Sequence, residues 1–158
     1  MKNLVIILLL FFGGVYTYAQ TSDTLIVKEL QNKGVSFSNN NTVTLLACGQ
    51  EKYDDLTKAI SCARKSIHLE YFNFRNDSIS HHIFHILENK VQEGVEVRIL
   101  FDAFGNMSNN RPLKRKHIDS LRAKGIEIYK FDPINFPWIN HVFTRDHRKI
   151  VVIDGCIA

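Results

Sequence analysis

The sequence predicts an α/β fold, in which the strands of one sheet are connected by helices. Short runs of aliphatic and β-branched residues alternate with amphipathic stretches of 12 to 16 residues. This is the pattern of strands joined by right-handed crossover helices. In addition, 45% of the 158 residues are hydrophobic, which is enough for a packed core. The length allows at most one domain of ordinary size.

The first 19 residues have the pattern of an export signal. A short positive start at residues 1–3 precedes an almost wholly apolar stretch over residues 4–16, and Thr17 and Ala19 are small residues at the positions that matter for cleavage. We expect a cleaved signal or, as the alternative, an uncleaved anchor, although a spanning helix needs about 20 apolar residues. Residues 20–41 are polar and predict a linker that leads into a domain over residues 42–158.

Four elements are predicted between residues 42 and 94, in the order strand, helix, strand, helix. A β-branched run predicts a strand over residues 42–47, and apolar residues at helical spacing predict a helix over residues 50–65. Residues 66–74 alternate as a strand does. Asp77 or Ser78 is the expected N-cap of the next helix, which Gly94 ends.

The second half predicts two more strands around a helix, and then a last strand. Residues 95–101 are rich in aliphatic side chains, so we expect a strand buried on both faces. A polar loop over residues 102–110 leads to a helix that starts at Pro112 and ends at Gly125. A strand over residues 126–131 and another over residues 145–154 complete the set, and Asp154 with Gly155 forms a closing turn.

The charge balance favours an anionic partner. The net charge is +4 and the isoelectric point is near 9.0, which suits a phospholipid surface, a nucleic acid or a phosphate ester without selecting among them. The three cysteines, Cys48, Cys62 and Cys156, lack the paired spacing of a zinc site. A single bridge between Cys48 and Cys62 is the remaining alternative in an oxidising compartment.

The last predicted strand carries the residues with the clearest chemistry. His147 and Lys149 are two apart, so they project to the same face of the strand. An imidazole can attack phosphorus or carry a proton, while an ammonium group stabilises charge on a phosphate oxygen, and this chemistry needs no metal. Asp154 lies seven positions after His147, an odd offset, so it reaches the imidazole only if the strand ends or bulges. The alternative role for Asp154 is that of a turn residue.

These residues, with their upstream context, resemble the HKD motif of the phospholipase D superfamily and, within it, the cardiolipin synthase branch. The matching segments are residues 66–72, 94–102, 131–133 and 145–155, and the similarity covers roughly residues 42–158. The resemblance implies a mixed sheet flanked by helices, incomplete at its C-terminus. It also implies a bacterial protein that is exported across the cytoplasmic membrane or anchored to it.

The resemblance also implies a mechanism without metal or other cofactor. In that family two HKD motifs meet, one histidine forms a phosphohistidine intermediate, and the other protonates the leaving alcohol. His147 would be one of the two histidines, Lys149 would bind phosphate, and Asp154 would support a histidine or the turn. The expected substrate is an anionic phospholipid such as phosphatidylglycerol, met at a membrane surface.

The sequence departs from the family pattern in one respect. The family continues into a second half with its own HKD motif, whereas Ala158 lies only four residues past Asp154. We therefore expect a truncated first half that is inactive alone, completed by a missing C-terminal region or by a second subunit. Two alternatives stay open: a secreted hydrolase or nuclease of the same superfamily that uses water, and a non-catalytic secreted binding module.

Several other residues have a functional and a structural interpretation. Glu70 and Asp102 lie on or just past strands beside the expected site and could orient a histidine or lysine; Glu70 is the better candidate, because a half-buried carboxylate needs a partner. His81 and His85 have metal-ligand spacing, but a third ligand is missing, so His81, His82 and His85 are expected on a solvated helix face. The basic run Lys114, Arg115 and Lys116 predicts a solvated face or a contact with anionic lipid, and residues 136–138 an interfacial wedge or a packed loop.

Overall fold

The computed structural model describes residues 24–38, 40–133, 137 and 143–158. The chain divides into two units, Met1–Leu45 and Leu46–Ala158, each considered by itself. The predicted signal or anchor lies outside the described residues. In the first unit, residues 24–32 form a helix within the stretch predicted to be a linker. No helix of the described residues is both long and apolar enough to cross a membrane.

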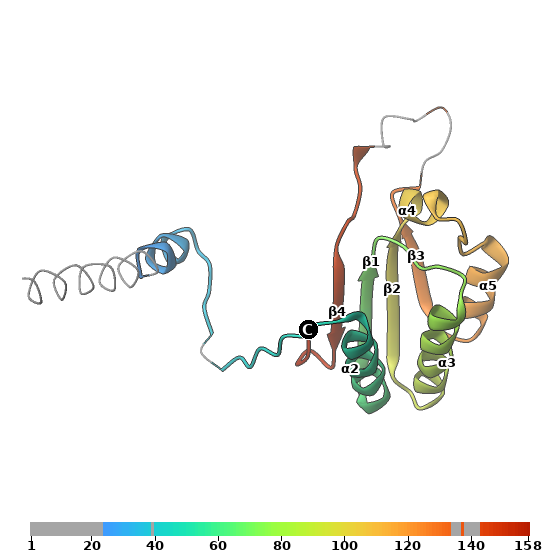
Figure 1. Ribbon diagram of the computed structural model, residues 1–158, viewed down its shortest axis with the longest axis horizontal. Helices are drawn as coiled ribbons and strands as arrows, with labels where there is room; N and C mark the ends of the chain where they lie inside the picture. The colour runs from blue at the N-terminus through green and yellow to red at the C-terminus, as the bar shows by residue number, and fades with distance from the viewer. Residues whose placement is uncertain (1–23, 39, 134–136, 138–142) are drawn as a thin grey trace, which may run out of the picture. The chain divides into compact units, whose positions relative to one another are not determined.

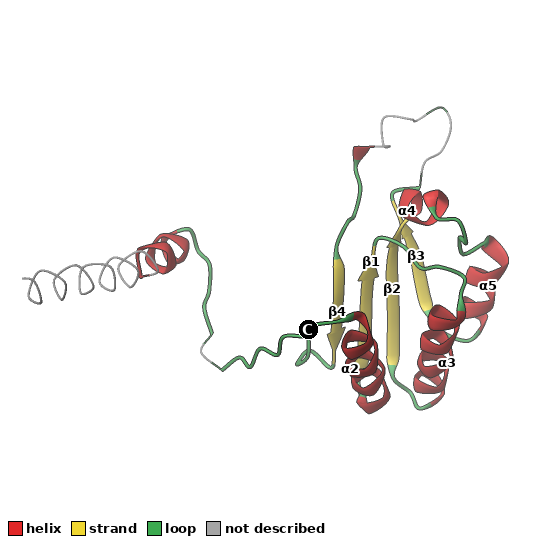
Figure 2. Cartoon of the chain, viewed as in Figure 1, coloured by secondary structure: helices red, strands yellow, loops and turns green. Residues whose placement is uncertain are grey.

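The second unit is built around a mixed four-stranded sheet in the order β3-β2-β1-β4. β1 pairs in parallel with β2, and β2 with β3, whereas β4 runs antiparallel beside β1. Figure 1 shows β4 at one side of this sheet, and Figure 2 shows the helices connecting the other strands. In chain order the elements are α2 (Gly49–Cys62), β1 (Ser66–Tyr71), α3 (Ser78–Gln92), β2 (Glu96–Asp102), α4 (Ala103–Ser108), α5 (Arg115–Ala123), β3 (Glu127–Phe131) and β4 (Lys149–Ile153).

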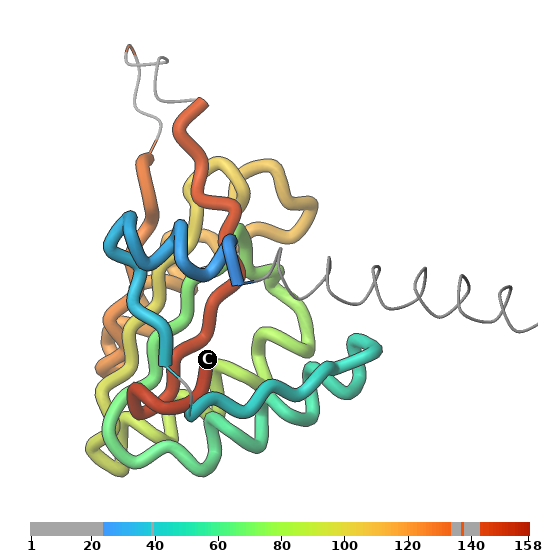
Figure 3. Tube along the Cα trace, turned by 90° about the vertical axis from the view of Figure 1, so that its left-hand side faces the viewer, coloured from blue at the N-terminus to red at the C-terminus, as the bar shows by residue number. Residues whose placement is uncertain are grey.

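The predicted α/β class is therefore confirmed, and alternation along the strands explains how the core forms. Every second strand residue faces α2, α3 and α5, whose apolar stripes complete one cluster. Figure 3 shows the sheet from its side, with α3 displaced to one side of β2. The fully buried side chains of the cluster include Ile60, Ile67, Leu87, Val97, Ile99, Phe101, Ile126, Ile128 and Ile153.

The prediction that β2 is buried on both faces is wrong. Val97, Ile99 and Phe101 are buried, but Glu96 and Arg98 between them are exposed. Arg98 forms ion pairs with Glu96 and with Glu127 of β3, so the face of the sheet away from the helices carries charge. Aliphatic richness alone does not distinguish one buried face from two.

Three further predictions of local structure are wrong. The chain over residues 42–47 is exposed coil, because the described residues offer it no partner strand for its backbone hydrogen bonds. The predicted loop after β2 contains α4, whose first turn Asp102 caps by accepting from the Gly105 N–H at 2.8 Å. Pro112 does not start α5; it lies in an isolated bridge with Arg75.

The ends of the other elements follow the expected signals. Asp77 is the N-cap of α3 and accepts a hydrogen bond from the Ser80 N–H. Gly94 follows that helix with a φ of +87°, a conformation that favours glycine. All three cysteines are free and exposed, so the alternative of a Cys48–Cys62 bridge is not met.

A substitution at Gly105 can test the close packing of α4 against the residue that follows β1. A Cβ at this position would overlap the carbonyl oxygen and the ring of Phe72, whereas one at Gly49 meets nothing within 4 Å. We expect Gly105→Ala to lower the free energy of unfolding by about 1–3 kcal/mol, the usual cost of overpacking. Gly49→Ala is the matched control and should be neutral or slightly stabilising in urea unfolding. Equal effects of the two substitutions would contradict this packing.

Candidate active site

His147 and Lys149 lie together where β4 begins, but the strand predicted over residues 145–154 is shorter than expected: β4 covers Lys149–Ile153, so His147 lies two residues before it. The Lys149 Nζ donates to the His147 Nδ1 at 2.9 Å and to the His147 backbone oxygen at 2.6 Å. Both side chains are exposed. Lys149 is also the first residue of β4 and pairs with Tyr71 at the end of β1, so the sheet fixes the base of this pair.

Phe72 provides the packing surface for the pair. Its ring centroid lies 4.7 Å from that of His147, and the Lys149 ammonium lies 5.5 Å from the centre of the Phe72 ring. An aromatic face attracts a nearby cation and restricts an imidazole that packs on it. Since Lys149 is a donor only, His147 accepts at Nδ1, and the neutral imidazole then carries its proton on Nε2.

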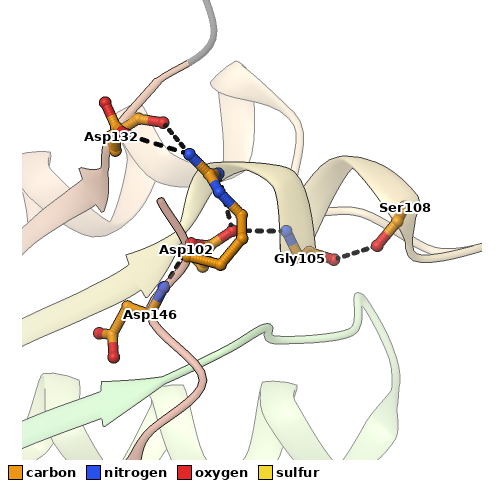
Figure 4. Close-up of polar contacts among 6 residues, drawn as sticks. Asp102, Gly105, Ser108, Asp132 and Asp146 are labelled. Atoms are coloured by element: carbon orange, nitrogen blue, oxygen red, sulfur yellow. Dashed lines mark hydrogen bonds and ion pairs between the residues drawn. The ribbon is translucent and has the colours of Figure 1, made fainter. Parts of the chain in front are cut away.

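The segment just before this pair belongs to a buried network of charged residues. Asp102 is 0% exposed; it accepts from the Arg145 Nη1 at 3.1 Å and from the backbone N–H of Asp146 at 2.9 Å. Arg145 also donates from Nη2 to the Asp132 carboxylate at 3.1 Å. Figure 4 shows Asp102 between Gly105 of α4 and Asp146. The network joins the ends of β2 and β3 to the segment that carries His147.

Glu70 belongs to a second charged group, with Asp146 and Arg148. Arg148 Nε lies 3.4 Å from both carboxylates, and Asp146 is buried. Burial, and then the neighbouring Asp146 carboxylate, raise the pKa of Glu70, while Arg148 opposes that rise. Asp146 Oδ2 is buried without a hydrogen-bond partner in the described part of the chain. The contacts of Glu70 are thus with Arg148 and Asp146 rather than with His147 or Lys149.

Asp154 lies at the opposite end of β4 from His147. Its carboxylate accepts from the backbone N–H groups of Arg64, Lys65 and Ser66 at 2.7–3.2 Å. These three hydrogen bonds hold its pKa below the usual value of 3.8. Its φ of 54° starts the turn into Gly155. The structure therefore places Asp154 in the turn, the second of the two roles that the sequence left open, and does not bring it to the imidazole.

The remaining candidates lie away from the His147–Lys149 pair. His81 donates from Nε2 to the Asn76 Oδ1, and with His85 and His117 it lines a groove between α3 and α5. Within the described ranges, no three His, Cys, Asp or Glu side chains are grouped so as to hold a metal ion. Arg115 of the basic run is exposed and pairs with Asp119. Phe136 and Trp138 lie outside the described residues.

Sequence reasoning ranked Glu70 above Asp102 and missed Arg145, Asp132 and Phe72. Asp102 ends an aliphatic strand, which is a usable signal for a buried acid. Arg145 directly precedes the His-x-Lys run, but its partners lie 43 and 13 residues away in the chain. Only the fold brings these residues together, so neither spacing nor alternation could have indicated the contacts.

A mixed α/β sheet with a His-x-Lys pair at its edge strand places the chain in the phospholipase D superfamily. A family described as "Cardiolipin synthase, PLD-like domain" matches residues 56–158. The chain belongs to this family.

Relatives found by sequence agree with this assignment. The chain is 39% identical over 134 residues to a cardiolipin synthase of Halalkalibacterium halodurans, covering 84% of this chain and 25% of that protein. It is 37% identical over 130 residues to cardiolipin synthase 2 of Staphylococcus epidermidis, covering 82% and 26%. The chain thus spans about a quarter of the length of these relatives. Among solved structures, the phospholipase D family member Nuc from Salmonella typhimurium is similar with a TM-score of 0.43 and 25% identity, over 64% of this chain and 56% of that one.

The hydrogen bonds of Asp154 predict a pH-dependent contribution to stability. Because its pKa in the folded state is lowered, the ionised form stabilises the fold above the unfolded pKa, and this stability is lost as the pH falls through the folded pKa. We expect Asp154→Asn to lower the melting temperature at pH 7, with the difference from the wild type closing below about pH 3.8. Asp55→Asn, on the exposed surface of α2, is the control. A difference that does not change with pH would refute the role of the charge.

The raised pKa of Glu70 predicts a pH dependence of stability opposite to that of Asp154. A carboxyl group with a raised folded pKa is costly to ionise in the native state, and this cost disappears as the pH falls below its unfolded pKa, near 4.5. Glu70→Gln should therefore melt at or above the wild-type temperature at pH 7, and the two proteins should converge toward pH 4.5. A variant that is less stable at pH 7 would show that the ion pair with Arg148 outweighs burial and the charge of Asp146.

Proposed function

We propose that the protein is a phosphatidyltransferase of the cardiolipin synthase type, and that this chain provides one of its two His-x-Lys halves. The observation that supports this most is the exposed His147–Lys149 pair, set on the edge strand of a domain whose relatives are cardiolipin synthases. The charge of +4 suits an anionic phospholipid as the substrate. The donor and the acceptor are each phosphatidylglycerol.

Two histidines share the reaction in this proposal. The lone pair of one imidazole attacks the phosphorus of the donor lipid, the bond from phosphorus to the glycerol oxygen breaks, and the second imidazole gives its proton to that oxygen. A phosphatidyl-histidine remains. The second imidazole then takes the proton from the acceptor's hydroxyl group, whose oxygen attacks phosphorus, so that cardiolipin forms and the first histidine is restored.

The contact between Lys149 and His147 limits both parts of this chemistry. The ammonium group has three N–H donors, of which two are directed to His147, so one remains for a non-bridging phosphate oxygen. With Nδ1 accepting, the imidazole is neutral and carries its only proton on Nε2. For His147 to act as the nucleophile, Lys149 must turn from Nδ1 toward the phosphate, so that Nδ1 holds the proton and Nε2 has a free lone pair. For His147 to act as the general acid, Lys149 must also leave Nδ1, because the acid is the imidazolium with a proton on each nitrogen.

The second half-site and the location of the protein complete the proposal. The second His-x-Lys pair is contributed by another region of the same gene product or by a second subunit. Residues 1–19 direct the protein across the cytoplasmic membrane or anchor it there, so that catalysis takes place at the membrane surface.

Replacing His147 tests the proposal directly in the protein expressed from its complete gene. With phosphatidylglycerol vesicles, we expect His147→Ala to reduce the formation of cardiolipin and free glycerol by about a thousandfold or more. His85→Ala, a surface histidine of α3, is the matched control and should leave the rate unchanged. Acid quenching of the wild type should trap a phosphatidyl group on histidine.

The products separate the proposal from its rivals. Phosphatidic acid in place of cardiolipin would show that water is the acceptor and would identify a hydrolase. Cleavage of nucleic acid, without any reaction of the lipid, would identify a nuclease. Unchanged lipid transfer in His147→Ala, or no reaction in any assay, would refute a catalytic role for this pair.

A further inference from the structure

We propose that Arg145 is a positioning residue, whose guanidinium group, held between Asp102 and Asp132, fixes the orientation of His147 for the reaction. This inference rests on the proposed function, since it assigns a role within the same site. Arg145 need not touch the substrate; it acts through the backbone and through Phe72.

The segment before β4, residues 144–148, needs contacts of this kind because it is not paired with a strand of the sheet. The ladder between β1 and β4 begins at the pair Tyr71 and Lys149, so His147 lies outside it. Residues 144–148 have no regular secondary structure. A segment without ladder hydrogen bonds is positioned only by other contacts.

Arg145 provides these contacts with a planar fork. Its Nη1 lies 3.1 Å from Asp102 Oδ1, and its Nη2 lies 3.1 Å from Asp132 Oδ2 and 3.2 Å from the Asp132 backbone oxygen. The side chain of Arg145 is 14% exposed, and that of Asp102 is 0% exposed. Hydrogen bonds between charged groups with so little access to water are strong and directional.

Asp102 transmits this order to His147 by two routes, and Figure 4 shows the first contact of each, to Asp146 and to Gly105. By the first, its Oδ2 accepts from the N–H of Asp146, the residue that precedes His147. By the second, its Oδ1 accepts from the N–H of Gly105, which packs against Phe72, and the Phe72 ring in turn packs against His147. The Asp102 carboxylate thus helps to fix the position of both the backbone and the ring of His147.

Lysine should not replace arginine at this position. A lysine keeps the positive charge, but it is a single point donor and lacks the rigid fork that joins two carboxylates in one plane. Because a misplacement of about 1 Å can cost on the order of a hundredfold in rate, loss of the fork should be visible in turnover even where the fold persists.

The experiment compares Arg145→Lys with wild type in the protein expressed from its complete gene. With phosphatidylglycerol vesicles, we expect kcat to fall about tenfold or more while KM stays within about twofold, because the substrate still meets Lys149. Arg122→Lys is the matched control: Arg122 donates from Nε and Nη2 to the Ile128 oxygen, between α5 and β3, away from the site. Its kcat should equal that of the wild type.

A second variant and a second measurement guard against simple unfolding. Asp132→Asn leaves Asp102 in place and should lower kcat by less than Arg145→Lys does. The Cε1–H resonance of His147 in NMR spectra reports the ring environment beside Phe72 without any need for activity. It should move in Arg145→Lys and remain in place in Arg122→Lys.

The outcomes are distinct. A kcat in Arg145→Lys equal to that of wild type, with an unmoved His147 resonance, would overturn the positioning role. A loss of activity that follows the loss of folded protein, or a raised KM with unchanged kcat, would overturn it as well. If the wild type transfers no lipid, the proposed function fails, and the His147 resonance still decides whether Arg145 orders the ring.

Discussion

A carboxylate without access to water is tolerated only where hydrogen bonds and opposite charge replace its hydration. Asp102 meets this condition with Arg145, the Asp146 N–H and the Gly105 N–H. These partners belong to the first turn of α4 and to the segment before β4, whereas Asp102 itself ends β2. Removing one partner would leave a buried charge uncompensated, so the three parts are constrained to meet. The position of the segment that carries His147 depends on this constraint.

Two aspartates, Asp102 and Asp154, hold the two ends of β4 in place through different contacts. At its start the Asp102–Arg145 pair orders the chain, and past its end the Asp154 carboxylate binds three consecutive N–H groups after α2. Between them, pairing with β1 alone joins β4 to the sheet in the described residues. Asp154 therefore contributes by fixing the strand, whereas the proposed function assigns the chemistry to His147 and Lys149.

Periodicity predicted the helices and most strands, because burial on one face imposes a repeat that local sequence records. It failed where the outcome depended on a distant partner. Residues 42–47 have strand composition but pair with no strand among the described residues, and α4 follows from a cap that Asp102 forms. The site divides in the same way. Alternation predicted that His147 and Lys149 project to the same face of one strand; the two side chains do meet, but His147 lies before β4 rather than in it. Glu70 is the better candidate by sequence and Asp102 the more buried acid in the structure, because burial cannot be assigned without the fold.

The direction of the Lys149 contact limits how His147 can act. An ammonium group only donates, so its bond to Nδ1 leaves the imidazole proton on Nε2, and an Nε2 that carries a proton has no lone pair with which to attack phosphorus. A neutral imidazole is also too weak an acid to protonate a leaving oxygen, so the acid role needs a second proton on Nδ1. Either role therefore requires Lys149 to leave Nδ1. A phosphate oxygen that draws Lys149 away would couple the reaction to correct placement of the substrate, and a phosphatidyl group trapped on His147 would show that this movement occurs.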